Sequence, residues 1–184
     1  MADSAPDFAA ALTGRQLPDL AVRLEETLAV LTLRYFAADG AFAAAVRAVL
    51  GAGLPGTQAA VSAGGVLLAW RSPTETLALA ADAGVLIGGL ADAPEGCCID
   101  LSGGMKMLRV SGPRGPDFLC RLGGTGVVPR AAESRRGRLA DVPVQLIGMP
   151  GAAGAGAAET LLVVERVYAP HLLGWIRETL ADLG

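Results

Sequence analysis

The stretch VLLAWRSPTETLALA, residues 66–80, decides the fold class because it describes two strands joined by a tight turn. Val66 to Trp70 is an apolar run, the segment 72–75 interrupts it, and Thr76 to Ala80 resumes it. Two strands that follow one another through so short a connection pair antiparallel. The sequence therefore predicts a hairpin within an antiparallel sheet.

Helices and further strands flank this hairpin on both sides. Upstream, residues 27–36 alternate in part and predict a strand, and residues 41–50 place apolar side chains at helical spacing before Gly51. Downstream, residues 83–91 are weakly helical and residues 97–101 predict another strand. The order to this point is strand, helix, strand, strand, helix, strand.

A second, similar round follows along the chain. It predicts strands over 105–111, 142–149 and 160–168 and helices over 115–122 and 170–183. The last helix carries one apolar stripe, made of Leu172, Leu173, Ile176, Leu180 and Leu183. Two such rounds, in place of alternating strand–helix units, favour an α+β protein with mostly antiparallel sheets and helices on one face of each.

The chain of 184 residues fits one compact domain or two very small ones that share a core. Residues 1–26 show no sustained periodicity, so we expect an N-terminal arm there. Residues 27–184 then form a single domain, with interlocked halves at about 27–102 and 105–184. The Gly- and Ala-rich residues 150–158 predict a loop.

Composition and charge exclude several classes of function. Fifteen basic residues against 18 acidic ones give a net charge of −3, which disfavours a nucleic-acid partner. A mean hydropathy of +0.47 favours a surface that another protein covers. Lys106 is the one lysine, and a GC-rich genome that encodes Arg in place of Lys is the simpler explanation of that count. The acidic start, the broken apolar run 77–91 and three cysteines indicate a cytoplasmic protein with reduced thiols.

The sequence contains few motifs that are typical of catalysis, metal binding or cofactor binding. His171 is the single histidine, and its place at the start of the last helix is more typical of a cap or rim contact than of a catalytic base. The sequence has no Cys-x-x-Cys motif, no histidine pair and no phosphate-binding glycine loop that opens a helix. We therefore expect no catalytic, cofactor-binding or metal-binding residue in this chain.

Two features are candidates for a partner interface. The run 130–138 contains Arg130, Arg135, Arg136 and Arg138, enough guanidinium groups to bind an anion or an acidic partner, although a solvated connecting loop is the simpler interpretation. Trp175 lies off the apolar stripe of the last helix and is a candidate interface anchor, whereas Trp70 is better interpreted as core.

Several short motifs, in order, resemble one known family. They are the strand and turn 70–79, the segment Ile99-Asp100-Leu101-Ser102, the segment 108–119 with its Ser-Gly-Pro, and the segment 139–144 with its Val-Pro-Val. The series is similar to the gamma subunits of heterotetrameric sarcosine oxidases, which are related to the folate-binding domain of the glycine-cleavage T-protein, an aminomethyltransferase. Val127-Val128 stands where the family carries an acidic residue and a histidine.

This resemblance implies a fold of two interlocked ferredoxin-like βαββαβ layers, like that folate-binding domain. It also implies a non-catalytic subunit that packs on the large folate-handling subunit of a complex which oxidatively demethylates a secondary N-methyl amine. Alpha, beta and delta subunits would be its partners. Those partners would hold FAD, FMN, NAD, tetrahydrofolate and zinc.

Two alternatives remain open. The chain could be the corresponding subunit of an N-methylglutamate dehydrogenase-like complex. It could also be a stand-alone T-protein-like protein that binds tetrahydrofolate, with Asp100 and the arginines near 130 holding the pterin and the glutamate tail. The second alternative requires a central cavity with a buried acid.

Overall fold

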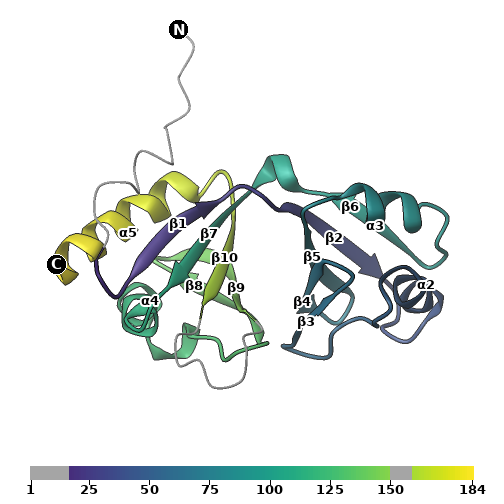
Figure 1. Ribbon diagram of the computed structural model, residues 1–184, viewed down its shortest axis with the longest axis horizontal. Helices are drawn as coiled ribbons and strands as arrows, with labels where there is room; N and C mark the ends of the chain where they lie inside the picture. The colour runs from purple at the N-terminus through teal and green to yellow at the C-terminus, as the bar shows by residue number, and fades with distance from the viewer. Residues whose placement is uncertain (1–16, 150–158) are drawn as a thin grey trace, which may run out of the picture.

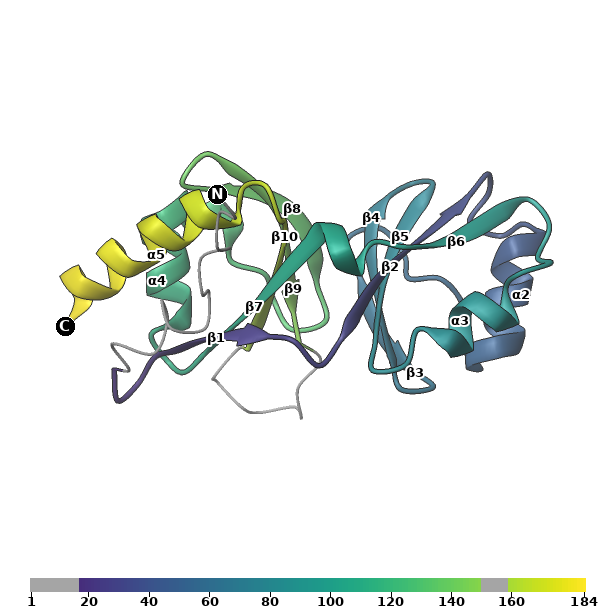
Figure 2. The same ribbon diagram turned by 90° about the horizontal axis from the view of Figure 1, so that it is seen from above.

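The computed structural model describes residues 17–149 and 159–184, and it places two five-stranded sheets face to face at the centre of an elongated molecule (Figure 1). Every strand pairing within the two sheets is antiparallel. Helices cover the outer side of each sheet, as the view from above shows (Figure 2). This arrangement confirms the predicted α+β class with helices on one face of each sheet.

The first half is built from one continuous stretch of chain, in the strand order β3-β4-β5-β2-β6. Without the edge strand β3, it is a βαββαβ unit of the ferredoxin type. Its elements are β2 (Ala29–Tyr35), α2 (Ala41–Leu50), β3 (Ala60–Ala63), β4 (Val66–Ser72), β5 (Glu75–Ala80), α3 (Gly84–Gly89) and β6 (Gly96–Asp100).

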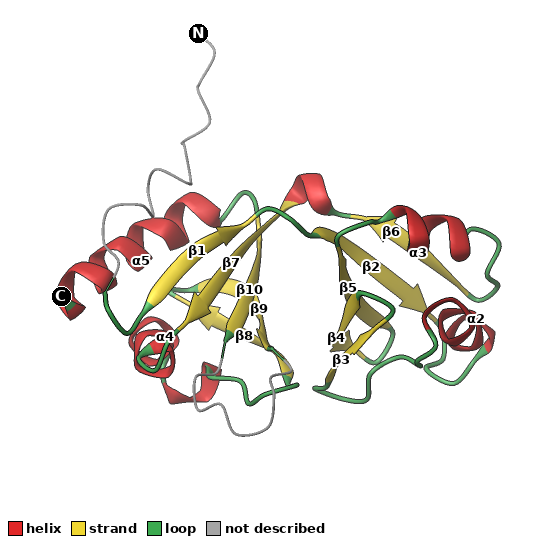
Figure 3. Cartoon of the chain, in the orientation of Figure 1, coloured by secondary structure: helices red, strands yellow, loops and turns green. Residues whose placement is uncertain are grey.

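The second half has the matching order β8-β9-β10-β7-β1, in which β1 occupies the place that β6 holds in the first half. The strand β1 (Ala21–Glu25) comes from before the first half, so the chain interlocks the two layers. The other elements are η1 (Ser102–Gly104), β7 (Met105–Ser111), α4 (Gly115–Gly123), η2 (Thr125–Val127), β8 (Ser134–Leu139), β9 (Val142–Gly148), β10 (Thr160–Glu165) and α5 (Ala169–Leu183) (Figure 3).

The strand β1 corrects the expectation of an arm that extends to residue 26. Ala21 to Glu25 pair with β7 from Ser111 to Met107, and Val22 is buried with 7% of its surface exposed. The sequence signal was weak because five residues give too few alternations to reveal a strand. Residues 1–16 of the expected arm and the predicted loop 150–158 lie outside the described residues.

Side-chain alternation along the strands produces three apolar layers. On β2, Leu31 and Leu33 face the helices α2 and α3, whereas Val30 faces the other sheet. Leu161 and Met107 of the second half meet Val30 in this central layer. A third cluster lies between the second sheet and its helices α4 and α5. The strands of both sheets are thus apolar on two faces, which explains their nearly continuous apolar sequences.

One edge of each sheet is joined to the other sheet by backbone hydrogen bonds. The amide of Ala60 donates to the carbonyl of Ala132 at 2.8 Å, and the amide of Ser134 donates to the carbonyl of Gln58 at 2.9 Å. These bonds frame a bridge between Ala59 and Glu133. The edges at β3 and β8 are therefore tied together, which fixes how the two sheets face each other.

Candidate partner interface and the pocket between the sheets

The exposed face of α5 carries the tryptophan selected from the sequence. The apolar stripe of this helix is buried as expected, while Trp175 remains 53% exposed. Val167 and Tyr168, just before and at the start of the helix, are 74% and 43% exposed. A shallow pocket of about 320 Å³ lies along this face, lined by Pro170, His171, Gly174, Trp175 and Glu178. Aromatic residues at the centre of such a surface are typical anchors of protein interfaces.

His171 connects this face to the second sheet. Its ring Nε2 lies 3.2 Å from the carbonyl oxygen of Ala140, in the turn between β8 and β9. The imidazole is at the exposed rim of the helix, and within residues 17–149 and 159–184 its one hydrogen-bond partner is this carbonyl oxygen. The structure therefore gives His171 the geometry of a rim contact that holds the first turn of α5 against the β8–β9 turn.

The arginine run forms a strand where a connecting loop was the simpler expectation. Residues 134–139 pair with β9, because Gly137 and Leu139 fit against apolar groups of the second half. Sequence analysis missed this strand because three of its six residues are arginines, distributed over both faces. Alternation then separates the guanidinium groups, since Arg135 lies on the opposite face of β8 from Arg136 and Arg138.

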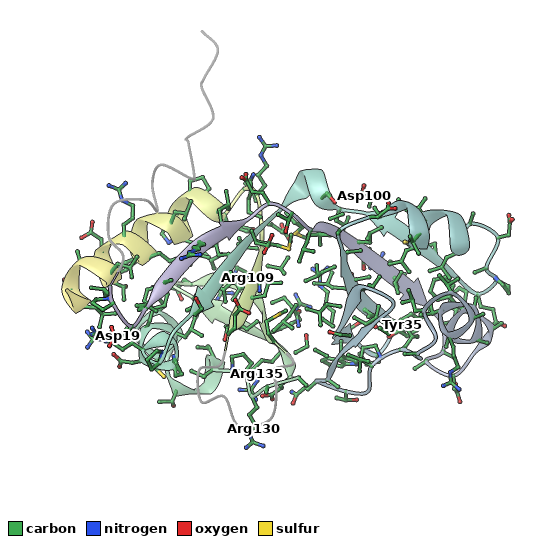
Figure 4. All side chains as sticks on the ribbon, in the orientation of Figure 1. Asp19, Tyr35, Asp100, Arg109, Arg130 and Arg135 are labelled. Atoms are coloured by element: carbon green, nitrogen blue, oxygen red, sulfur yellow. The ribbon has the colours of Figure 1, made fainter. Side chains whose placement is uncertain are left out.

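Each arginine of the run has a different environment. Arg135 forms an ion pair with Glu133 at 2.8 Å and donates to the carbonyl of Gly126 at 2.7 Å. Arg138 donates to the carbonyl of Asp141. Arg130 is exposed and lies near Arg135 at the lower edge of the molecule in Figure 4, and Arg136 lines a pocket between the two sheets. The four arginines do not form one anion site.

A second exposed apolar surface lies on the first half. Phe36 is 84% exposed, and Ile99 on the edge strand β6 is 41% exposed. Val85 and Ile87 of α3 are also exposed. A pocket of about 400 Å³ adjoins Phe36 and is lined by Arg34, Tyr35, Phe36, Thr74, Glu95, Gly96 and Cys97. Sequence reasoning missed this surface, although Phe36 at the end of an alternating strand was an available signal.

Asp100 does not provide the buried acid that the folate-binding alternative requires. It is exposed at the end of β6, and its carboxylate accepts a hydrogen bond from the amide of Ser102 at 2.8 Å. Hydrogen bonding to Ser102 holds the pKa of Asp100 below its ordinary value. Asp100 and Arg130 lie near opposite sides of the molecule (Figure 4), so the structure does not bring these two groups together.

Polar side chains meet between the sheets, in a cluster that sequence analysis did not identify. The carbonyl oxygen of Trp70 accepts hydrogen bonds from Ser134 Oγ at 2.9 Å and from Gln145 Nε2 at 3.1 Å. Ser134 and Gln145 also bond to each other at 2.8 Å. On the facing sheet, Glu75 Oε1 accepts from Thr32 at 2.8 Å and from Arg71 at 3.0 Å. Trp70 thus contributes its backbone to the contact between the halves, and its side chain is only partly buried.

Comparison with known proteins identifies the family of this chain. The family described as sarcosine oxidase, gamma subunit matches residues 34–182. The chain belongs to this family. A curated relative, the sarcosine oxidase subunit gamma of Arthrobacter sp., is 32% identical over 149 residues, which are 76% of this chain and 70% of the relative. The resemblance seen in the sequence motifs is thereby confirmed.

Solved structures show the same fold. A chain of the heterotetrameric sarcosine oxidase from Corynebacterium sp. U-96 aligns with a TM-score of 0.75 at 22% identity, covering 95% of this chain and 90% of that one. The glycine cleavage system aminomethyltransferase T from Bartonella henselae aligns with a TM-score of 0.64 at 12% identity. That alignment covers 92% of this chain and 49% of the aminomethyltransferase. The predicted likeness to the aminomethyltransferase fold is confirmed.

Among residues 17–149 and 159–184, no group of three or more His, Cys, Asp or Glu side chains is arranged to hold a metal ion. Within the same residues, no helix has the length and apolar character needed to cross a membrane.

Proposed function

We propose that this chain is the non-catalytic gamma subunit of a cytoplasmic heterotetrameric sarcosine oxidase-like complex, which oxidatively demethylates a secondary N-methyl amine. The observation that carries the proposal is the family match over 34–182, nearly the whole described chain. Its role is to assemble with and stabilise the large folate-handling subunit. Alpha, beta and delta subunits are the partners, and they hold FAD, FMN, NAD, tetrahydrofolate and zinc.

The exposed side chains support a docking role for α5. Trp175 with Val167 and Tyr168 offers aromatic and aliphatic area at low cost in side-chain entropy, as interface anchors do. The arginines Arg130, Arg135 and Arg138 lie on the same half and suit acidic groups at the rim of an interface. Arg136 is set apart from them because it lines the pocket between the sheets.

Co-expression tests the proposal. The chain produced alone should aggregate or lose solubility, and co-expression with the large subunit of its own complex should restore a soluble assembly with a flavin absorbance spectrum. Trp175→Ala should weaken that assembly at least about tenfold, because truncating an anchor typically costs more than about 1.4 kcal/mol of binding. Arg177→Ala, two residues further along α5 and also exposed, is the matched control and should leave assembly unchanged.

Other outcomes have definite meanings. A stable, monodisperse monomer that captures no flavoprotein would overturn the proposal. Loss of assembly with Phe36→Ala, but not with Trp175→Ala, would move the interface to the first half. Heat on titration with tetrahydrofolate at high micromolar concentration would instead favour the stand-alone folate-binding protein.

A further inference from the structure

The strand β6 is an open edge of the first sheet. It pairs with β2 on one side, and no strand of the described chain lies on its other side. The opposite edge of the same sheet, at β3, is tied to the second sheet through the bridge between Ala59 and Glu133. Because β6 and α5 lie toward opposite ends of the molecule (Figure 1), this edge is separate from the surface proposed for α5.

The backbone groups of β6 divide between its two sides. The amide of Leu101 donates to the carbonyl of Val30 at 2.8 Å, and the amide of Phe36 donates to the carbonyl of Glu95 at 3.2 Å. Because hydrogen-bonded positions alternate in an antiparallel pair, the odd-numbered residues of β6 turn their backbone groups toward β2. The groups that point away from the sheet belong to the even-numbered residues, Gly96, Cys98 and Asp100.

These outward groups match the backbone of another extended strand. None of the three amides and three carbonyls has a hydrogen-bond partner in the described parts of the chain. A row of donors and acceptors at alternate residues is the surface to which an extended peptide adds as a strand. Edges that stay unpaired normally carry charged side chains or Pro, as β1 does with Arg23 and Glu25. The strand β6, Gly-Cys-Cys-Ile-Asp, has one charge, at its end.

Exposed apolar side chains lie on both sides of this edge. Cys98 packs against the core under the helices, so Cys97 and Ile99 project from the opposite face of the strand, where both are exposed. Phe36, 84% exposed, lines the same pocket of about 400 Å³ as Cys97. On the helix side, α3 packs against β6, and its Val85 is exposed. A strand added at β6 would cover apolar area on both of its faces.

Arg34 distinguishes among possible occupants. It lies directly across from β6 on β2 and lines the pocket at this edge. Glu95 of the same pocket accepts a hydrogen bond from the amide of Ala41 at 3.0 Å. Glu75, across from Arg34 on β5, forms its ion pair with Arg71 at 3.0 Å. Within the described residues Arg34 has no ion pair, so an occupant that carries a carboxylate complements this edge.

We propose that β6 accepts an extended strand from another subunit of the complex, which makes the first sheet six-stranded. The inference rests on the proposed function and adds the mode of one contact. The incoming strand carries apolar side chains on both faces and an Asp or Glu that pairs with Arg34. A second copy of this chain fits less well, because the carboxylate of its β6, Asp100, lies on the helix side with Cys98 and brings no acid to Arg34.

Hydrogen exchange in the co-expressed, purified complex tests this contact residue by residue. At an open edge, the amides of Gly96, Cys98 and Asp100 should exchange at least about tenfold faster than those of Cys97 and Ile99, which bond to β2. With a strand added, all five amides should exchange slowly. Fast exchange at the three outward amides, in a complex that assembles, overturns the proposal and leaves the subunit role intact.

Substitutions at the edge provide a second test. Ile99→Lys introduces the kind of charge that blocks edge pairing, and it should weaken assembly at least about tenfold. Ala48→Lys adds the same charge at an exposed position of α2 in the same half and should leave assembly unchanged. Arg34→Gln should weaken assembly about threefold and reduce its dependence on salt concentration, because one ion pair is lost.

The outcomes separate this contact from the subunit role. Equal assembly of the wild type and Ile99→Lys overturns the proposal. A complex whose mass contains two copies of this chain, joined at β6, assigns the edge to a second copy and also overturns it. Failure of the wild-type chain to assemble with any large subunit overturns the proposed function itself, and the co-expression experiment reports that failure independently of the β6 variants.

Discussion

The two halves of the molecule share one architecture but differ in how the chain completes it. The first half is finished by its own last strand, β6, which follows α3 and pairs with β2. The second half ends with α5, and the place of the missing last strand beside β7 is filled by β1 from the N-terminal side. The second half is therefore complete only when residues more than 80 positions apart have paired, such as Val22 with Val110.

This difference shows how a repeated fold can join its two halves into one unit. The first sheet can form from the contiguous residues 29–100. The second sheet needs β1, and the whole first half lies between β1 and the rest of that sheet along the chain. Because contacts between distant residues cost more loop-closure entropy, we infer that the first half is the more independent of the two.

The largest expected effect is obtained by placing a charge in β1. Val22→Asp should lower the free energy of unfolding by about 3 kcal/mol, because an unpaired carboxylate would be buried in the core of the second half. Urea denaturation measures this effect. Ile99→Asp, on the corresponding strand β6, is the control and should change stability by about 0.5 kcal/mol or less, since Ile99 is 41% exposed. Equal losses in the two variants would contradict the comparison.

A smaller effect is expected where the chain leading into β1 crosses the end of β7. Gly112 has φ +105°, and a Cβ atom there would lie 2.3 Å from the carbonyl oxygen of Asp19. Gly112→Ala should therefore displace the start of β1 and destabilise the protein by about 2 kcal/mol. Hydrogen exchange should show faster opening in β1 than in β2. Gly103→Ala, with open space around its Cβ, should leave exchange unchanged.

The smallest effect concerns the ion pairs that attach β1 to the second sheet. Arg109 bonds Glu25 through Nε at 3.0 Å and Nη2 at 2.7 Å, and its Nη1 lies 3.0 Å from Glu159. Burial alone would raise the pKa of Glu25, but hydrogen bonds from Thr27 and Arg109 outweigh it and hold that pKa below the ordinary value of 4.5. The folded state therefore binds fewer protons than the unfolded state near this pH.

Glu25→Gln should lower stability by about 1 kcal/mol at neutral pH, since it removes one charge from a partly buried pair. The lowered pKa means that this contribution is fully present above pH 4.5 and is lost as the pH falls through the folded-state pKa. Denaturation curves at pH 7 and at pH 3 measure the two limits. A difference between variant and wild type that persists unchanged to pH 3 would show that the charge of Glu25 is not the cause.

Much of the fold could be predicted from the sequence because local signals were strong. The hairpin at 66–80, the helix 41–50 with its Gly51 cap and the terminal helix were all recognised from periodicity and turn residues, and each is present. The strands β1, β3 and β8 were missed. Two of them are short, and β8 has arginines at half of its positions, so their strand character comes from pairing with β7, β4 and β9.

The candidate surfaces were only partly visible in the sequence. Trp175 could be selected because it departs from a clear helical stripe. The four arginines could be selected as a group, but Arg130 lies before β8, and strand alternation places Arg135 on the opposite face of β8 from Arg136 and Arg138. The assignment of these residues to a partner interface stays a prediction. Gln145 gave no signal at all, since a single glutamine in an apolar strand has the same sequence pattern whether its amide is satisfied or not.

The sequence by itself determined the α+β class, the repeated order of elements and, through its motifs, the family. Those features depend on neighbours in the chain, whose spacing is fixed by helix and strand geometry. Only the tertiary structure decided that β1 completes the second half, that Arg136 faces the other sheet, and that Gln145 retains an unpaired oxygen between the halves. These features depend on contacts between residues far apart in sequence, for which the local pattern carries no information.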